Sequence, residues 1–271
     1  MKVGFVIKKD CKRCALVVRK IEEMLPSDWV TVYDEETAKF LDVRHDPLEK
    51  MTADIIITVG GDGTVLRTIN KCDVPVLGVN MGKLGFLSEV EIGEVEKSIY
   101  KLVRGEYRIE ESERIKVIVN GEEIQHCTNE VVIHTNRVSK IRKFGLYVNS
   151  TFIDNIAADG VIVATPIGST SYAYSTGGPI LSPKINAMVV SYIAPFNVKI
   201  RPLVVSEDEE ITINLRGKNQ DCILIFDGHT EYPVSPDDDI RVRVSEKKAR
   251  FVTLGSFYER MRRKLLRNVV N

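Results

Sequence analysis

The sequence predicts an α/β domain with a parallel sheet, followed by a mainly antiparallel β domain. Strand-like and helix-like segments alternate as far as Gly105, which is typical of a parallel sheet with helices on its faces. Beyond Gly105, short alternating runs are separated by turn residues, as in antiparallel β domains. A chain of 271 residues with 44% hydrophobic content can form two such cores. We therefore expect domains at residues 1–105 and 106–252, and a C-terminal helix within 253–271 that docks back on the first domain.

Hydrophobic periodicity places the elements of the first domain. Strands are expected at Val3–Ile7, Val30–Tyr33, Ile55–Val59 and Pro75–Val79, and helices at Cys11–Met24, from Val65 onward and at Ile92–Val103. The run Ile55–Val59 is mostly apolar, which is typical of a parallel strand buried on both faces. The five residues after it, Gly60-Gly61-Asp62-Gly63-Thr64, connect this strand to a helix, and we call them the glycine loop.

In the second domain, the turn dipeptide Asn120-Gly121 predicts a hairpin between Lys116–Val119 and Glu122–Cys127. Further strands are expected at Glu130–His134, Gly145–Asn149, Thr151–Ile156, Val161–Ala164, Ile211–Leu215, Cys222–Phe226 and Ile240–Val244, and short helices at Ser169–Ser175 and Lys184–Tyr192.

The C-terminal segment 257–269 has the pattern of a helix with one apolar stripe and one basic side. The stripe consists of Phe257, Met261, Leu265, Leu266 and Val269, and the basic side of Arg260, Arg263, Lys264 and Arg267. We expect a docking helix whose basic side faces solvent, with contact to a membrane surface as the alternative.

The charge balance gives no support for a nucleic-acid or membrane partner. Lys plus Arg and Asp plus Glu each number 38, so the formal net charge is zero. No apolar run approaches the ~18 residues of a membrane span, and the N-terminus lacks the apolar core of a signal peptide. We therefore expect a cytoplasmic protein.

Five cysteines include one C-x-x-C pair, Cys11 and Cys14, between a strand and a helix. Such a pair is compatible with a redox role, because a helix N-terminus lowers the pKa of a thiol, or with two small residues at the start of a helix. The other three, Cys72, Cys127 and Cys222, supply no second pair for a zinc site, and the odd total argues against a disulfide framework.

The glycine loop has the chemistry of a phosphate site. Three glycines let backbone N–H groups approach a phosphate closely, and the following helix N-terminus adds positive potential. A carboxylate there repels such a ligand unless it accepts a proton or holds a metal, as Asp62 could do. The alternative is an ordinary tight turn, which the helical spacing of Val65, Leu66 and Ile69 disfavours. The loop matches neither the P-loop nor G-x-G-x-x-G.

A second unusual passage runs from Asp159 to Pro179 and gathers hydroxyl residues around Pro166 and Gly168. Hydroxyls both donate and accept hydrogen bonds, which suits ribose and base edges. The alternative is a capped short helix with Ser169 or Thr170 as N-cap.

Four blocks of residues stand in the order found in NAD kinases, which the chain resembles over nearly its whole length. They are the glycine loop, Asn80–Leu87, Asn129-Glu130 and Thr165–Tyr172. The glycine loop alone is shared with diacylglycerol and sphingosine kinases. The resemblance implies phosphoryl transfer from ATP or inorganic polyphosphate to the 2′-hydroxyl of the adenosine ribose of NAD, with a divalent cation, Mg²⁺ for preference, on the donor phosphates.

The resemblance also implies roles for residues near the glycine loop. Asp62 would be the general base, Phe86 would stack on a nucleotide base, and Gly60, Gly61, Gly63, Thr64 and Arg67 would contact phosphates. In the second domain, the residues expected to bind NAD are Asn129, Glu130, Lys140, Asp159, Thr165, Thr170, Ser171, Tyr172, Ser175, Ala194 and His229. Asp159 often acts across a subunit boundary in this family, so a homodimer or homotetramer is expected.

The chain departs from the family pattern at a few positions. Ile167 replaces a usual Thr, which removes a hydroxyl, and Ser171 replaces a usual Ala, which adds one. His229 stands where Gln often follows Asp-Gly, and it is either a pH-dependent ligand contact or a surface residue. Two other functions stay open from sequence: a lipid kinase that contacts membranes through its basic tail helix, and a dinucleotide sensor without transfer activity.

Overall fold

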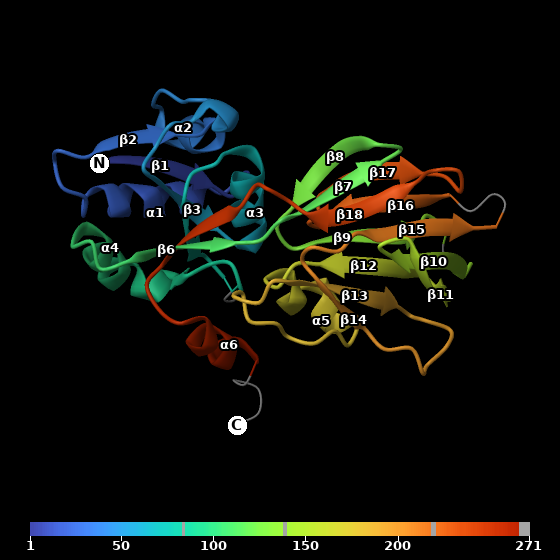
Figure 1. Cartoon of the computed structure of the whole chain (residues 1–271). Coiled ribbons are helices and arrows are strands. Elements are labelled where there is room, and N and C mark those ends of the chain that lie inside the picture. The colour runs from blue at the N-terminus through green and yellow to red at the C-terminus, as the bar shows by residue number, and fades with distance from the viewer. Residues whose placement is uncertain (83–84, 138–139, 218–220, 266–271) are drawn as a thin grey trace. The chain divides into compact units, whose positions relative to one another are not determined.

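The structure is a computed structural model, and it describes residues 1–82, 85–137, 140–217 and 221–265. The chain folds as two compact units (Figure 1). The first unit comprises Met1–Glu111 together with Ala249–Asn271, and the second comprises Ser112–Lys248. The second unit is therefore inserted into the sequence of the first.

A seven-stranded sheet, sheet A, forms the centre of the first unit. Its order is β2-β1-β3-β4-β19-β6, with β5 also beside β4. The pairs of β1 with β2 and β3, and of β4 with β3, β5 and β19, are parallel. The strands are β1 (Lys2–Ile7), β2 (Val30–Tyr33), β3 (Ile55–Gly60), β4 (Val76–Asn80), β5 (Val90–Glu91), β6 (Arg108–Ser112) and β19 (Ala249–Thr253).

Helices cover both faces of sheet A. The helices of this unit are α1 (Lys12–Glu22), α2 (Glu35–Leu41), α3 (Asp62–Lys71), α4 (Val95–Val103) and α6 (Phe257–Leu265), with 3₁₀ turns η1 (Leu48–Lys50) and η2 (Ile92–Glu94), and helices α1 to α4 contact the sheet or share a core with it. Val18 of α1 and Ile99 of α4 share one core with Phe5 of β1. Gly78 of β4 faces the other side, where an added Cβ would lie 2.9 Å from Val65 of α3. Strand β3 is buried along its whole length, which explains its mostly apolar sequence.

Two six-stranded antiparallel sheets form the second unit. Sheet B has the order β11-β10-β15-β18-β7-β8, and its strands are β7 (Ile115–Val119), β8 (Glu122–Cys127), β10 (Arg142–Val148), β11 (Thr151–Ala158), β15 (Ile211–Arg216) and β18 (Ile240–Val244). Sheet C has the order β14-β13-β12-β9-β16-β17, and its strands are β9 (Glu130–Thr135), β12 (Gly160–Ala164), β13 (Ala187–Ile193), β14 (Leu203–Ser206), β16 (Cys222–Phe226) and β17 (Thr230–Val234).

The core of the second unit lies between the inner faces of its two sheets. Phe144 and Ile213 of sheet B share it with Ile133 and Leu224 of sheet C. The outer face of sheet C is covered by the segment that contains η3 (Gly168–Thr170) and α5 (Tyr172–Ser175), because Ala173 packs with residues of β9 and β12 there. The hydroxyl-rich passage is thereby fixed against sheet C.

The predicted fold class is confirmed: a parallel α/β unit and an antiparallel β unit. The predicted hairpin is also present, with φ of 54° at Asn120 and 83° at Gly121, as a two-residue turn with two positive φ angles requires. Short helices occur within Ser169–Ser175 as expected, but neither Ser169 nor Thr170 caps α5, whose N-cap residue is Ser171.

One predicted helix is wrong. Residues 187–193 of the segment predicted as Lys184–Tyr192 form strand β13, which pairs with β12 and β14. A short apolar run that is buried on both faces has no period that separates strand from helix. Six further elements were not predicted from the sequence, and most of them are short, polar or at a sheet edge. They are α2, β5, β6, β14, β17 and β19.

The C-terminal helix belongs to the first unit, as expected, but its basic side does not simply face solvent. Arg260 is buried and forms an ion pair with Glu89, and Arg263 lies 3.2 Å from Glu94. Two arginines therefore hold α6 by ion pairs, which leaves less basic surface for a membrane contact. The predicted stripe residues Leu266 and Val269 lie outside the described residues.

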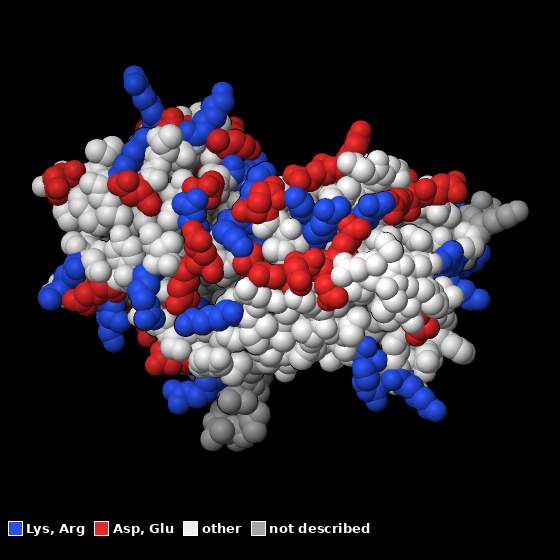
Figure 2. All heavy atoms as spheres, in the orientation of Figure 1, with Lys and Arg blue, Asp and Glu red and all other residues white. Residues whose placement is uncertain are grey.

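Figure 2 shows Lys and Arg side chains beside Asp and Glu side chains over part of the displayed face, and an extended area without charged side chains over the rest. Within the described residues, no helix is long and apolar enough to cross a membrane.

Cys11 and Cys14 form a disulfide directly after β1, and Cys11 is also the N-cap residue of α1. The odd cysteine total argued against a disulfide framework, and a single bridge between residues three positions apart is not such a framework. A redox role for this pair stays a prediction.

Candidate functional sites

The glycine loop lies where the strand order of sheet A reverses. The chain passes from β1 outward to β2 on one side and from β3 outward to β4 on the other. Ligands of open α/β sheets bind at the carboxyl ends of the strands at such a reversal point. Strand β3 ends at Gly60 and α3 begins at Asp62, so the loop presents the N-terminus of a ten-residue helix at this point.

Two glycines of the loop have different steric surroundings. A Cβ on Gly60 would lie 2.2 Å from Oγ1 of Thr64, so the first turn of α3 requires a glycine there. A Cβ on Gly61 would meet nothing within 4 Å, so the backbone of Gly61 borders open space. Thr64 is buried, while Gly61, Asp62 and Gly63 are partly exposed. The accessible part of the loop is therefore backbone together with one carboxylate.

The carboxylate of Asp62 is held by the segment that follows β4. It accepts hydrogen bonds from the N–H of Phe86 at 2.5 Å, and from the N–H and hydroxyl of Ser88 at 3.0 and 2.8 Å. A Cβ on Gly85 would lie only 1.6 Å from Oδ1 of Asp62. Sequence reasoning named Asp62 and Phe86 but missed Gly85 and Ser88, although Gly85 lies within the block Asn80–Leu87. We call residues 60–64 with 85–88 the glycine-loop site.

Arg67 reaches from α3 to the end of β1. Its Nη2 donates to the carbonyl of Ile7 at 2.7 Å and lies 3.3 Å from Oδ2 of the buried Asp34. Asp34 also caps α2 by accepting from the N–H of Thr37. The positive charge of Arg67 is thus largely balanced inside the first unit.

A second site lies in the second unit at the start of β9, where Asn129 and Glu130 meet Asp227. Asp227 is buried and accepts hydrogen bonds from the N–H groups of Thr128, Asn129 and Glu130, at 2.9, 2.7 and 3.2 Å. Strand β16 pairs with β9, so that Asp227, which follows β16 with a φ of 48°, arrives beside these three amides. We call Asn129, Glu130, Ser171 and Asp227 the β9 site.

Glu130 is a buried carboxyl in this site. Burial and then the negative charge of Asp227 raise its pKa to about 8, so it is mainly protonated at neutral pH. Its Oε1 accepts from the hydroxyl of Ser171 at 3.2 Å. Its Oε2 and the Oδ1 of Asn129 are buried without a hydrogen-bond partner among the described residues. Buried polar atoms without partners are uncommon, so these two atoms point to a missing ligand or water.

The hydroxyls of Thr165 and Thr170 face the protein backbone. Thr165 donates to the carbonyl of Thr128 at 2.6 Å and accepts from the N–H of Gly168 at 3.0 Å, and Thr170 donates to the carbonyl of Ile167. A Cβ on Gly168 would lie 1.9 Å from the carbonyl oxygen of Asn129. These contacts fasten the 165–170 segment to the β9 site.

Three other residues that the sequence predicts to bind NAD are exposed on the surface near this segment, and we call them the rim of the β9 site. Tyr172 and Ser175 are exposed on α5. His229 is exposed in the turn after Asp227, and its Nδ1 lies 2.5 Å from the carbonyl oxygen of Asp227.

The structure places Asp159, Ala194 and Lys140 at the opposite end of sheet C. Ala164 pairs with Glu130 and Gly160 pairs with His134, so the two ends of β12 are four residues, or about 13 Å, apart. Asp159 precedes β12 and its N–H donates to the carbonyl of Ile193, next to the exposed Ala194. Lys140 is exposed just before β10, which pairs with β11 near Ala158. Within one chain, these residues do not join the β9 site.

Comparison with known proteins gives one consistent family. A model described as the ATP-NAD kinase N-terminal domain matches residues 3–107, and one described as the ATP-NAD kinase C-terminal domain matches residues 128–254. Curated NAD kinases of Thermoplasma acidophilum and Thermoplasma volcanium are 49% and 50% identical to this chain, with 100% of both chains covered in each case.

Two solved structures have the same fold. An NAD kinase from Archaeoglobus fulgidus in complex with ATP is 29% identical, with a TM-score of 0.81 over 98% of this chain and 99% of that one. Yeast NADH kinase complexed with NADH is 24% identical, with a TM-score of 0.85 over 98% of this chain and 87% of that one.

Proposed function

The chain belongs to the NAD kinase family and phosphorylates NAD to NADP, and we propose that Asp62 is the general base of this reaction. The full-length relatives favour this function over the lipid kinase and the sensor that the sequence left open. The observation that carries the proposal is the fixed carboxylate of Asp62, which three donors from Phe86 and Ser88 orient at the start of α3. A base must be oriented on the proton that it accepts, here from the 2′-hydroxyl of the adenosine ribose.

The remaining loop residues serve the phosphoryl donor in this proposal. Gly60, Gly61 and Gly63 present backbone to phosphate, and the open space at Gly61 supports this role. Phe86 supplies a stacking surface, whereas the buried Thr64 packs against Gly60 and positions the loop instead of contacting phosphate. Arg67 adds little net charge, because Asp34 neutralises it, and it serves instead to hold α3 against β1. ATP is the donor that we favour, because a relative was solved with ATP, and polyphosphate is the alternative.

The β9 site binds NAD in this proposal. Asn129 and Glu130 contribute the two unpartnered buried oxygens. A ribose hydroxyl can donate to Oδ1 of Asn129 and accept from the protonated carboxyl of Glu130, because hydroxyls both donate and accept. Ser171 and Thr170 stand next to them, and Tyr172, Ser175 and His229 form the rim. Thr165 acts as a positioning residue, because its hydroxyl is used within the protein.

Asp159, Lys140 and Ala194 bind NAD in the site of a second copy of the chain. Their place at the far end of sheet C supports this assignment, which implies a homodimer or homotetramer. The cytoplasm is the location that we propose. If the chain is a monomer at the concentrations of the assay, the three residues have no such role.

A divalent cation on the donor phosphates fits the residues that are present. A Mg²⁺ ion is held largely by phosphates and water, so it fits a loop whose one carboxylate, that of Asp62, serves as the general base. The ion would neutralise charge on the transferred phosphoryl group.

The test of Asp62 is the variant Asp62→Asn. Turnover should fall about 10²- to 10⁴-fold, which is the usual contribution of a general base, while NAD binding measured by calorimetry stays close to wild type. Ser88→Ala is the matched control, because it removes one donor to Asp62 but keeps the carboxylate, and its loss of turnover should be much smaller. Normal turnover in Asp62→Asn would rule out the assignment.

A further inference from the structure

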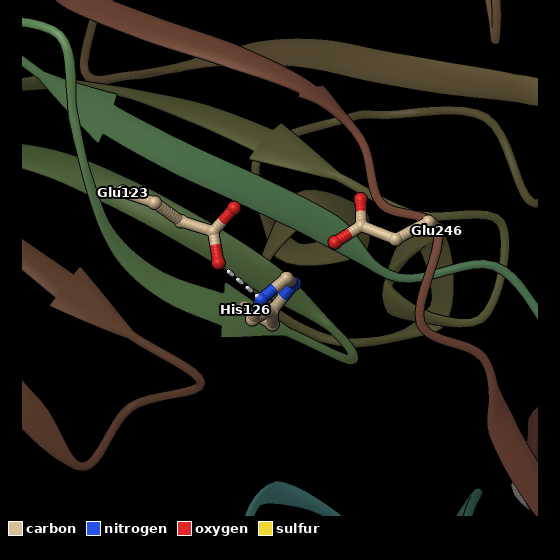
Figure 3. A group of neighbouring side chains, drawn as sticks. All are labelled: Glu123, His126 and Glu246. Atoms are coloured by element: carbon tan, nitrogen blue, oxygen red, sulfur yellow. Dashed lines mark hydrogen bonds and ion pairs between the residues drawn. The ribbon is translucent and has the colours of Figure 1, made fainter.

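A third group of polar residues in the second unit has no part in the proposed reaction. Glu123 and His126 lie on β8, and Glu246 lies in the turn after β18. One ligand atom from each lies within 4.8 Å of the other two, and Figure 3 shows the three side chains converging. We call these residues the Glu–His–Glu cluster.

An irregularity in β8 brings two of these residues together. Residues three apart in a regular strand point to opposite faces of the sheet. In the pairing of β7 with β8, however, Val117 pairs with Gln125 and Ile118 with Glu123, so Ile124 is an extra residue in β8. Such a bulge turns the side chains beyond it to the other face. Glu123 and His126 thereby share one face, with 2.7 Å between Oε1 and Nε2.

A hydrogen bond at Nδ1, on the side of the ring away from Glu123, orients the imidazole of His126. Its Nδ1 lies 2.7 Å from the hydroxyl of the buried Ser245, which also accepts from the N–H of Lys247. His126 itself is 8% exposed, whereas both glutamates are exposed. A metal-binding histidine is typically fixed in this way through its other ring nitrogen. In His126 the nitrogen that would bind a metal is Nε2, which now bonds Glu123.

A lysine of the protein, Lys116, already contacts the cluster. Nζ of Lys116 lies 2.7 Å from Oε2 of Glu246 and 4.0 Å from Oε2 of Glu123. Lys116 is paired with His126 in the β7–β8 register, so its ammonium group stands over the same face. An incoming metal ion would have to displace this group, so Lys116 competes with it.

We propose that Glu123, His126 and Glu246 form a binding site for a first-row divalent transition metal. One imidazole and two carboxylates suit Zn²⁺ and its neighbours, whereas Mg²⁺ prefers oxygen ligands and keeps its water. The bound ion would tie β8 to the turn after β18 and would stabilise sheet B. This inference is independent of the assignment of Asp62.

Zn²⁺ binding to the full chain tests the site, with a chromophoric chelator as competitor, Mg²⁺ in excess and no nucleotide. The background variant is C11S together with C14S, because a reduced C-x-x-C pair would itself bind Zn²⁺. We expect one Zn²⁺ per chain and a higher midpoint of thermal unfolding with Zn²⁺. Glu246→Gln should weaken the affinity about tenfold or more, and Lys116→Met should strengthen it.

Glu122→Gln is the matched control, because Glu122 is an exposed neighbour on β8 outside the cluster. Glu246 is exposed too, so its variant should fold normally, which circular dichroism checks. Equal Zn²⁺ affinity in Glu246→Gln and Glu122→Gln would overturn the proposal, as would the lack of saturable binding. Anomalous scattering from a Zn²⁺-soaked crystal should place the ion beside Nε2 of His126, and an ion elsewhere would also contradict it.

Discussion

The two carboxyl groups at the centre of the proposed reaction lie in opposite environments. Asp62 is partly exposed, and a neighbouring segment donates three hydrogen bonds to it. Glu130 is buried, keeps one oxygen without a partner among the described residues, and has a pKa raised by burial and by Asp227. The comparison indicates that hydrogen bonds within the protein fix the position of the Asp62 carboxylate. The carboxyl group of Glu130 instead keeps hydrogen-bonding capacity for a ligand.

After Asp62→Asn itself, the largest effect is expected at Gly85, which tests how closely Asp62 is held. In Gly85→Ala the added Cβ would collide with the Asp62 carboxylate, so segment 85–88 must move away. A displacement of about 1 Å at a catalytic group costs about 10²-fold in rate, and we expect kcat to fall by that amount.

The control for this variant is Gly93→Ala, because an added Cβ there meets nothing within 4 Å. Steady-state kinetics of both variants make the comparison. If Gly85→Ala keeps the kcat of Gly93→Ala, close packing against Asp62 has no part in catalysis.

The next effect is expected at Asp227, which tests whether the β9 site is positioned by a buried charge. Asp227→Asn replaces one acceptor oxygen by a donor that faces backbone N–H groups. One buried amide left unpaired costs about 1–3 kcal/mol, so the free energy of unfolding should fall by that amount and KM for NAD should rise. Urea denaturation and kinetics measure the two changes, and the exposed Asp221→Asn should alter neither.

A third prediction concerns pH and Glu130. Its pKa is 4.5 in the unfolded chain and about 8 in the folded one, so between these values the folded state holds a proton that the unfolded state has released. The free energy of unfolding should therefore fall as pH rises through this window, by at most about 1.4 kcal/mol per pH unit.

Glu130→Gln removes that contribution, because glutamine does not titrate. Chemical denaturation over the window should thus give a shallower dependence on pH in the variant than in the wild type. Identical slopes would mean that Glu130 is not buried in the way described.

The smallest effect is expected at Ser171, the hydroxyl that this chain has in place of the usual alanine. Its bond to Oε1 of Glu130 is 3.2 Å long and part-buried. Ser171→Ala should raise KM for NAD by the equivalent of about 0.5–1.5 kcal/mol. A double-mutant cycle with Glu130→Gln isolates the pair, and additive effects of the two changes would exclude any coupling.

The same contrast explains what could be predicted from the sequence. The glycine loop acts through residues that are adjacent in the chain, so its composition and the apolar strand before it were sufficient. The β9 site depends on Asp227, which reaches Asn129 across 98 positions through the pairing of β16 with β9. Sequence reasoning noticed the turn at Asp227 but chose His229 as the contact, because no local pattern reveals three backbone N–H groups arriving from another strand.

Other errors have equally physical causes. Strand β13 was predicted as a helix because an apolar run buried on both faces has no distinguishing period. The ion pairs of Arg260 with Glu89 and of Arg263 with Glu94 join residues about 170 positions apart, and an amphipathic pattern gives no sign of them. The bulge at Ile124 likewise becomes visible only when β7 and β8 are paired.

The insertion of the second unit between β6 and β19 has a consequence for biosynthesis. Strand β19 lies between β4 and β6 in sheet A, yet it comes from residues 249–253 near the end of the chain. While the ribosome is still translating the second unit, the edge of β4 at Val76 has no partner from β19. The second unit is continuous in sequence and can fold as soon as it emerges. The nascent first unit must therefore keep an open strand edge protected until β19 has also been translated.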